Sequence, residues 1–190
     1  MKTGLFFGSF NPIHIGHLAI ANYVVEYTDL KQVWFVISPQ NPLKKRKGLL
    51  ADYHRLSLVR EAIDGDLRFK ACDVEFKMPK PSYTIDTLAY LREQYPEREF
   101  AILMGADGLP TFHKWKNYEE LMHSCLRYIY PRPGIDLKGL KNLENCIFID
   151  APLIEISSTF IRDSIMDGKD MHYFLNDKVY KYLKEMHFYE

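Results

Sequence analysis

The sequence predicts an α/β protein: a single doubly wound, mainly parallel sheet with helices on both faces, in a Rossmann-like arrangement. Three observations support this fold class. Short apolar strands alternate with amphipathic helical segments along the chain, which is typical of βαβ units. The strands are nearly continuous apolar runs, as at residues 32–38, and such runs suit a sheet covered on both sides. The 190 residues are the right length for one domain.

Apolar periodicity defines the elements of the first half of the chain. The helices repeat apolar residues every three to four positions, as Leu18, Ala21 and Val25 do, whereas the strands are short apolar runs. A polar loop at 39–50 carries the basic run Lys44 to Lys47. In chain order, the expected elements are a strand at 3–8, a helix at 17–27, a strand at 32–38, a helix at 52–63 and a strand at 68–73.

The second half of the chain continues the same alternation. Pro96 stops one helix, and Gly168 closes another. The expected elements are a helix at 84–95, strands at 100–105, 126–130 and 147–149, and helices at 158–166 and 177–186. With no internal repeat and no linker, we expect a single domain over 1–190, with a small C-terminal helical part from about residue 157.

Composition excludes several classes of protein. The 25 basic and 25 acidic residues cancel, so a broad electrostatic grip on nucleic acid is disfavoured. Cys72, Cys125 and Cys146 are far apart and odd in number, which argues against a disulfide framework or a cysteine zinc site. Neither a membrane span nor a signal peptide is apparent, so we expect a cytoplasmic protein without membrane partners.

The most informative segment is Gly-Ser-Phe-Asn-Pro-Ile-His-Ile-Gly-His at residues 8–17, where the first strand turns into the first helix. In an open α/β sheet this place lies outside the carboxyl ends of the strands, where ligands bind. A helix N-terminus offers unpaired N–H groups to phosphate, and His14 and His17 can add further donors. Gly8 and Gly16 permit close approach of the backbone. The segment is neither a Walker A loop nor a GxGxxG fingerprint.

A second phosphate-binding candidate is Ile-Ser-Ser-Thr-Phe-Ile-Arg at residues 156–162. Ser157 is a good N-cap, and Ser158 and Thr159 add hydroxyl groups in the first turn of the helix. One turn later, Arg162 can reach back toward an anion with its forked guanidinium. Taken alone, the segment also suits an ordinary capped helix with a surface arginine.

These two segments resemble the signatures GxFxPxHxGH and ISSTxxR of the HxGH nucleotidyltransferase superfamily. Two internal segments narrow the resemblance to the bacterial nicotinate mononucleotide adenylyltransferases. Residues 81–88 read Pro-Ser-Tyr-Thr-Ile-Asp-Thr-Leu, similar to the family's SYTxDTL. Residues 104–107 and 112–115 read Met-Gly-Ala-Asp and Phe-His-Lys-Trp, similar to its GxD…FxxW. The resemblance spans almost the whole chain and implies an enzyme with a nucleotidyltransferase fold.

The resemblance implies a reaction between ATP and nicotinate mononucleotide, with Mg²⁺ held by the ATP phosphates and no dedicated protein ligands. The acceptor phosphate would attack the α-phosphorus of ATP, so charge stabilisation matters more than a strong base. His17 and His14 are the expected catalytic residues. The expected ATP-binding residues are Gly8, Ser9, Phe10, His14, Gly16, His17, Lys44, Gly105, Asp107, Ile156, Ser157, Ser158, Thr159 and Arg162. The expected acceptor-binding residues are Tyr83, Thr84, Trp115 and Lys116, with Trp115 against the pyridine ring.

The chain departs from the family pattern at two places. After the second strand, Pro42-Leu43-Lys44 replaces paired prolines, a histidine and a lysine. Lys44 is the expected phosphate contact, although Lys45, Arg46 and Lys47 stand beside it. Lys116 follows Trp115 where many relatives carry an aromatic residue. Its side chain either adds positive charge to the acceptor site or points to solvent.

Other functions remain open at this point. Two alternatives keep the adenylyl transfer but change the acceptor, to nicotinamide mononucleotide or to pantetheine phosphate. A third alternative is a noncatalytic nucleotide-binding module. An RNA-binding module built on Lys44 to Lys47 lacks a broad basic surface and a recognised motif. A zinc site at His14 and His17 lacks a third ligand nearby in sequence. The oligomeric state is not readable from the sequence.

Overall fold

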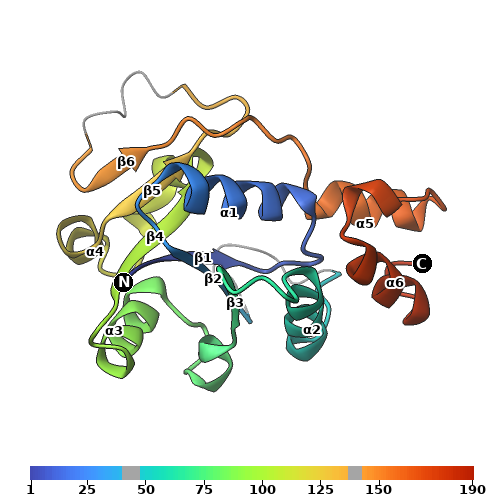
Figure 1. Cartoon of the computed structure of the whole chain (residues 1–190), viewed down its shortest axis with the longest axis horizontal. Coiled ribbons are helices and arrows are strands. Elements are labelled where there is room, and N and C mark those ends of the chain that lie inside the picture. The colour runs from blue at the N-terminus through green and yellow to red at the C-terminus, as the bar shows by residue number, and fades with distance from the viewer. Residues whose placement is uncertain (40–47, 137–142) are drawn as a thin grey trace.

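The computed structural model describes residues 1–39, 48–136 and 143–190. In this part of the chain, six strands form one sheet in the order β3-β2-β1-β4-β5-β6, and every neighbouring pair is parallel. The sheet runs through the middle of the molecule (Figure 1). The strands are β1 (Lys2–Gly8), β2 (Gln32–Ile37), β3 (Phe69–Cys72), β4 (Glu99–Gly105), β5 (Arg127–Tyr130) and β6 (Cys146–Phe148). The predicted doubly wound α/β class is confirmed.

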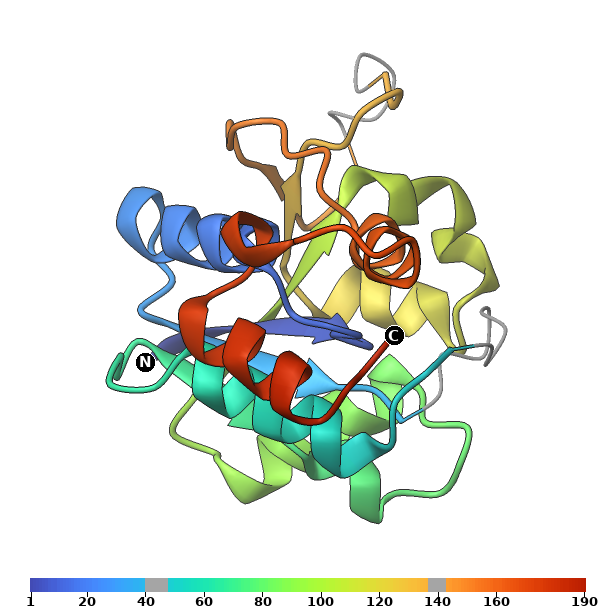
Figure 2. The same ribbon diagram turned by 90° about the vertical axis from the view of Figure 1, so that its right-hand side faces the viewer.

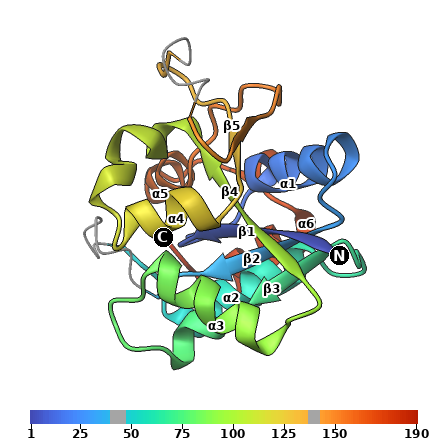
Figure 3. The ribbon, with the colours of Figure 1, turned by 90° about the vertical axis from the view of Figure 1, so that its left-hand side faces the viewer.

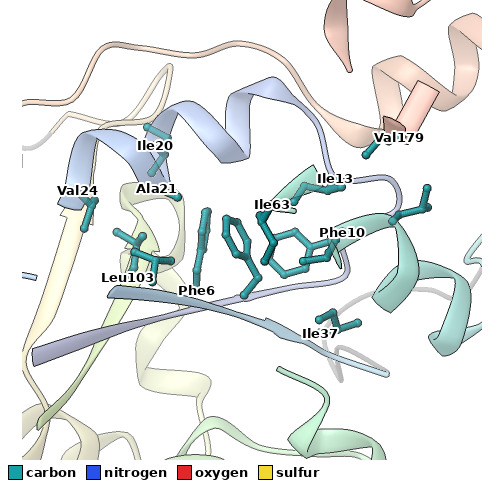
Figure 4. Close-up of a cluster of buried hydrophobic side chains, with 14 of the residues drawn as sticks. Phe6, Phe10, Ile13, Ile20, Ala21, Val24, Ile37, Ile63, Leu103 and Val179 are labelled. Carbon is teal, nitrogen blue, oxygen red and sulfur yellow. The ribbon is translucent and has the colours of Figure 1, made fainter. Parts of the chain in front are cut away.

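Helices cover both faces of this sheet, because alternate strand residues supply two separate apolar cores. One face packs against α1 (Ile15–Tyr27), α2 (Asp52–Ala62), α5 (Ser158–Met166) and α6 (Asp177–Glu185). The other packs against α3 (Thr84–Gln94) and α4 (Tyr118–Ser124). Phe6 and Phe35 point into the first core, whereas Leu5 and Trp34 point into the second. Figure 4 shows Phe6, Phe10 and Ile13 in the first core beneath α1.

The observed elements agree with the expected ones in type, and their ends differ by at most two residues. The largest shift is at α1, which begins at Ile15 rather than at residue 17, with His14 as its N-cap. Four elements escaped prediction, because three of them have seven residues or fewer and the fourth contains a proline. They are α4 and the 3-10 helices Val74–Lys77, Ala106–Lys114 and His172–Phe174.

The sheet order puts a crevice at the place where the candidate motifs lie. From β1 the chain moves to β2 and β3 on one side and then crosses to β4 on the other side of β1. This reversal is the topological switch point of a doubly wound sheet, and ligands bind outside the strand ends there. Gly8 ends β1 and Gly105 ends β4, so the first motif and the Gly105–Asp107 segment both begin at the switch point.

The C-terminal helices α5 and α6 lie at the carboxyl end of the sheet (Figures 1 and 2). Figure 3 shows the opposite end, where the chain begins at β1. Val179 and Leu183 of α6 are buried in the same core as Val59 of α2. The helical part that the sequence separates at about residue 157 is therefore packed on the sheet domain. Among the described residues, no helix has the length and apolarity to span a membrane.

Candidate active site

The turn after β1 is shaped by a buried phenylalanine. Phe10 is 1% exposed and adopts a φ of 45°, a conformation that side-chain-bearing residues rarely take. Its ring folds back over Gly8, where an added Cβ would lie 2.8 Å from the ring. The sequence predicts a close approach of a ligand to the backbone at Gly8, but in the structure it is the Phe10 ring that packs against this glycine. The packed ring fixes the path of the backbone from Ser9 into the helix.

The two histidines form a stacked pair at the start of α1. Their ring centroids are 3.8 Å apart, and the backbone N–H of His14 donates to Nδ1 of His17 at 3.3 Å. The edge of Phe10 supports the His17 ring, with centroids 5.1 Å apart. His17 is half-buried, so it is the more accessible member of the pair.

His14 lies deeper than His17. It is 4% exposed, and its Nδ1 has no hydrogen-bond partner among the described residues. Burial, aided by the positive charge of Arg132, lowers the pKa of His14 to about 4. At neutral pH its imidazole is therefore uncharged, and it can offer phosphate a hydrogen bond but no positive charge.

The second motif lies against the first, although the two are distant in sequence. Ser158 donates its hydroxyl to the carbonyl of Pro12 at 2.9 Å, and Arg162 donates to the carbonyl of Asn11 at 2.8 Å. Gly16 makes this approach possible, because a Cβ there would lie 2.9 Å from the side chain of Ile154. The N-termini of α1 and α5 therefore meet, as an anion site built from both motifs requires.

The remaining residues of the second motif have local roles as well. Ser157 is the N-cap of α5 and accepts a hydrogen bond from the N–H of Phe160 at 3.1 Å, as the sequence predicts. The exposed Thr159 accepts from Arg162 at 3.2 Å. The guanidinium of Arg162 thus joins the two motifs and stays half-buried at their edge.

A cavity of about 310 Å³ opens beside these helices at the end of β4. Asp107 and Arg132 line it from one side, with 3.5 Å between their charged groups. Gly105 lies against the Asp107 carboxylate, because a Cβ added at Gly105 would clash with it. The segment from Ile154 to Ser157, which includes the predicted Ile156, lines the other side. The cavity therefore joins the predicted Gly105–Asp107 segment to the second motif.

Arg132 is a site residue that sequence reasoning missed. It follows β5 at the carboxyl edge of the sheet and carries positive charge toward His14. A signal was available, because an arginine directly after a strand of a parallel sheet lies on the ligand-binding edge.

The predicted acceptor residues gather at the start of α3. Tyr83 is the N-cap and Thr84 is the first helical residue. Trp115 is half-buried and packs against Phe112 at 5.3 Å between ring centroids. Lys116 reaches back to this helix, with its Nζ 4.9 Å from the Tyr83 ring centroid. The structure thus brings all four predicted acceptor residues into one region.

Buried Glu75 supports the start of α3, and this role was not predicted from the sequence. It is 2% exposed and accepts hydrogen bonds from the hydroxyls of Ser82 at 2.7 Å and Thr87 at 2.9 Å. The carboxylate therefore holds both sides of the turn at Tyr83 and Thr84. Its burial depends on the 3-10 helix Val74–Lys77, which the sequence pattern did not reveal.

Arg55 and Asn11 hold the turn after β1, which we call the phosphate turn (residues 8–14), through hydrogen bonds to backbone carbonyls. Neither residue was predicted from the sequence. Arg55 of α2 is fully buried and donates to the carbonyls of Ser9 at 2.7 Å and Ser38 at 2.9 Å. The carboxamide of Asn11 donates to the carbonyl of Gly48 at 2.8 Å and accepts from the Tyr189 hydroxyl at 2.7 Å. These bonds connect the first motif to α2, to the loop after β2 and to the end of the chain.

Lys44, the predicted phosphate contact after β2, lies outside the described residues, as do Lys45, Arg46 and Lys47. Among the residues that the structure describes, no group of three or more His, Cys, Asp or Glu side chains is arranged to hold a metal ion.

Comparison with known proteins agrees with this geometry. The sequence pattern of the cytidylyltransferase-like family matches residues 5–164. A probable nicotinate-nucleotide adenylyltransferase of Flavobacterium johnsoniae is 48% identical over 192 residues, with 100% of both chains covered. One of Porphyromonas gingivalis is 51% identical over 176 residues, covering 92% of this chain and 89% of the relative.

Solved structures agree on the fold. The nicotinic acid mononucleotide adenylyltransferase of Plasmodium falciparum, complexed with NaAD, superposes with a TM-score of 0.79 at 20% identity, covering 99% of this chain and 97% of that one. A putative nicotinate-nucleotide adenylyltransferase from Vibrio parahaemolyticus gives a TM-score of 0.72 at 20% identity, covering 99% and 94%. Together with the full-length relatives, the family match shows that the chain belongs to the cytidylyltransferase-like family, among the nicotinate-nucleotide adenylyltransferases.

Proposed function

We infer that this chain is a nucleotidyltransferase of NAD biosynthesis, which transfers the adenylyl group of ATP to nicotinate mononucleotide and releases pyrophosphate. The observation that carries this function is the meeting of the two motifs, with Ser158 and Arg162 bonded to the turn that bears His14 and His17. The full-length relatives, near 50% identity and named for the same activity, support the choice of acceptor.

The reaction needs two anions held together and the developing charge stabilised. The acceptor phosphate has a second pKa near 6 and is largely ionised at neutral pH, so it can attack the α-phosphorus without a strong base. One of its oxygens forms a bond to that phosphorus, and the bond to the leaving pyrophosphate breaks. Positioning and electrostatic stabilisation therefore account for most of the rate enhancement.

We assign His17 to the α-phosphoryl group and to its charge in the transition state. Its half-exposed ring at the N-terminus of α1, supported by Phe10 and His14, supports this role. His14 serves as a neutral partner that holds the His17 ring in place. The N–H groups near Ser9 and Phe10 add donors at the same turn.

The triphosphate is assigned to the N-terminus of α5 and the cations around it. Ser157, Ser158, Thr159 and Arg162 belong to this group, and Lys44 is proposed as a further contact from the second loop. Arg132 joins them, because it lines the cavity beside Ser157 and acts on the charge state of His14. The adenosine part would occupy the cavity over Gly105 and Asp107, next to Ile156.

We propose that Mg²⁺ enters with ATP as part of the substrate rather than as a resident cofactor. Arg132 and Arg162 bring positive charge to the phosphate site, and Asp107 of the same cavity is paired with Arg132. When bound to the triphosphate, Mg²⁺ neutralises charge on the oxygens of the leaving pyrophosphate. Such an ion keeps water ligands and needs few protein carboxylates.

The acceptor ring is assigned to Trp115 and the start of α3. A half-buried indole suits a planar pyridine, and the first N–H groups of α3, near Thr84, suit the nicotinate carboxylate. Pantetheine phosphate has no planar ring for Trp115 to contact. This difference favours the nicotinate acceptor over the pantetheine one.

Pyrophosphate release with ATP tests the proposed function against its alternatives. The purified chain is offered nicotinate mononucleotide, nicotinamide mononucleotide or pantetheine phosphate at equal concentration. We expect the highest kcat/KM with the nicotinate acceptor. A higher value with either other acceptor would replace the proposed substrate, and no release with all three would point to a noncatalytic nucleotide-binding module.

A further inference from the structure

Lys116 lies at the surface, and its ammonium group bridges two segments of the proposed acceptor site. Its Nζ lies 2.8 Å and 3.1 Å from the two carboxylate oxygens of Asp86, and 4.9 Å from the Tyr83 ring centroid. Asp86 lies in the first turn of α3, whereas Lys116 follows Trp115 in another segment. The ammonium group therefore links the residue after Trp115 to the first turn of α3.

Asp86 creates an electrostatic problem for the acceptor proposed above. A carboxylate in the first turn of a helix already interacts with the helix N-terminus. A second anion placed at the N–H of Thr84, two residues earlier in α3, would lie near it, and like charges at such range repel. Lys116 offsets the charge of Asp86, so that the helix N-terminus stays attractive to an incoming carboxylate.

From this geometry we propose that the Lys116–Asp86 pair determines the specificity for an acceptor ring that carries a carboxylate. The inference rests on the proposed function and adds the side-chain charges that read the acceptor. Nicotinate and nicotinamide mononucleotides differ in one ring substituent, an anionic carboxylate in the first and a neutral carboxamide in the second. A pair that balances charge beside this substituent changes the binding of the first much more than that of the second.

The pair contributes little to folding, which makes it accessible to mutation. Side-chain exposures of 43% for Lys116 and 41% for Asp86 place it at the surface, where ion pairs add little to the free energy of unfolding. Substitution of either residue is therefore expected to leave the fold intact. An effect on acceptor choice would then report charge at the site.

The test measures kcat/KM with nicotinate and with nicotinamide mononucleotide and takes the ratio of the two. In Lys116→Met, which keeps an apolar stem but loses the charge, we expect the ratio to fall about five- to tenfold, with the nicotinamide value nearly unchanged. In Asp86→Asn we expect the ratio to stay or rise. The double variant restores the charge balance, and its ratio should return to within about twofold of the wild-type ratio.

Lys178→Met is the matched control, because Lys178 forms an exposed pair with Asp64 between α6 and the end of α2. It should leave the ratio unchanged. Equal losses with both acceptors in Lys116→Met and Asp86→Asn would mean that the pair only holds the segments together, and this outcome overturns the inference. A wild-type chain that forms no dinucleotide from the nicotinate acceptor would instead refute the proposed function.

Discussion

The two histidines of the first motif differ in their surroundings, and this difference separates their roles. His17 is half-exposed at the helix start, whereas His14 is buried and stacked on it with an uncharged ring at neutral pH. A protein can keep a buried neutral imidazole where it needs a rigid support without a charge to solvate. Substitutions at the two positions should therefore change different properties.

Removal of the His17 side chain should reduce the chemical step. We expect His17→Ala to lower kcat for dinucleotide formation about 100-fold, because a donor to developing charge is lost. The KM for ATP should change much less. Steady-state kinetics check this, with His123→Ala on α4 as the control that keeps normal turnover. An unchanged kcat in a folded His17→Ala protein would remove His17 from the mechanism.

His14 should make the free energy of unfolding depend on pH. Its pKa is about 4 in the folded protein and 6.5 when unperturbed, so between these values the unfolded chain binds a proton that the folded chain does not. Its contribution is complete above about pH 6.5 and is lost as the pH falls toward 4. Between pH 7 and pH 5, the free energy of unfolding should therefore fall by about 2 kcal/mol because of His14.

Denaturant unfolding of wild type and His14→Gln at both pH values measures this contribution. The variant should lose about 2 kcal/mol less than wild type on acidification. His113→Gln, at an exposed position, should follow the wild-type profile. Parallel pH profiles for wild type and His14→Gln would show that the imidazole is solvated in the folded protein.

At the residue scale, the sequence predicted the residues of the two motifs but not the side chains that pack against them. Ser157 was readable as an N-cap because capping depends on the next three residues. The partner of Gly16 was not readable, because Ile154 reaches it only after the sheet has formed. Arg55 and Asn11 look like ordinary polar residues in sequence, and their burial follows from packing of α2 and the C-terminal segment.

At the scale of elements, α2 is the support of the active-site edge. Arg55 projects from it and donates to carbonyls after β1 and β2, and its guanidinium also binds Asp52 at 2.6 Å. A fully buried arginine with this many acceptors is costly to remove, because the carbonyls lose their partners inside the protein. Helix α2 thus fixes two neighbouring strand ends at once.

Replacement of Arg55 should destabilise the protein and loosen the phosphate turn. We expect Arg55→Met to reduce the free energy of unfolding by about 3 kcal/mol or more. Arg60 lies on the exposed side of the same helix, and Arg60→Met should change stability by less than about 0.5 kcal/mol. Denaturant unfolding compares the two, and equal effects would mean that the buried hydrogen bonds contribute nothing measurable.

Elements of regular period were predictable from the sequence, and irregular ones were not. Strands β1, β2 and β4 are nearly continuous apolar runs, so their place in a two-sided sheet follows from composition. The predicted start of α1 was two residues late, because its N-cap is His14 and not one of the usual serine or aspartate caps. The backbone N–H of His14 donates to His17 in the first turn of the helix. The 3-10 helix Ala106–Lys114 contains Pro110, which lacks a backbone N–H group and argues against a helix in the sequence.

At the scale of the whole molecule, chain segments from both ends build one site. The first motif follows β1, the second begins α5, and the hydroxyl of Tyr189 reaches Asn11 from the end of the chain. The α/β class predicted that the first motif lies at the carboxyl ends of the strands. It did not predict the closure by Tyr189, which depends on the packing of α6.

This arrangement predicts that the C-terminal helical part unfolds together with the sheet. Val179 is fully buried in the core that includes Val59, so neither part keeps its apolar surface covered alone. Tryptophan fluorescence, which reports on the buried Trp34 and on Trp115, and far-UV circular dichroism should give the same denaturant midpoint. An earlier transition seen only by circular dichroism would show that the helical part is a separate folding unit.

The proposed reaction is an attack of the acceptor phosphate on the α-phosphorus of ATP where the two motifs meet. The most direct measurement uses nicotinate mononucleotide with ¹⁸O in its phosphate, followed by mass spectrometry of both products. We expect nicotinate adenine dinucleotide that retains all of the label, together with unlabelled pyrophosphate. Label in the pyrophosphate, or no dinucleotide at all, would contradict the account.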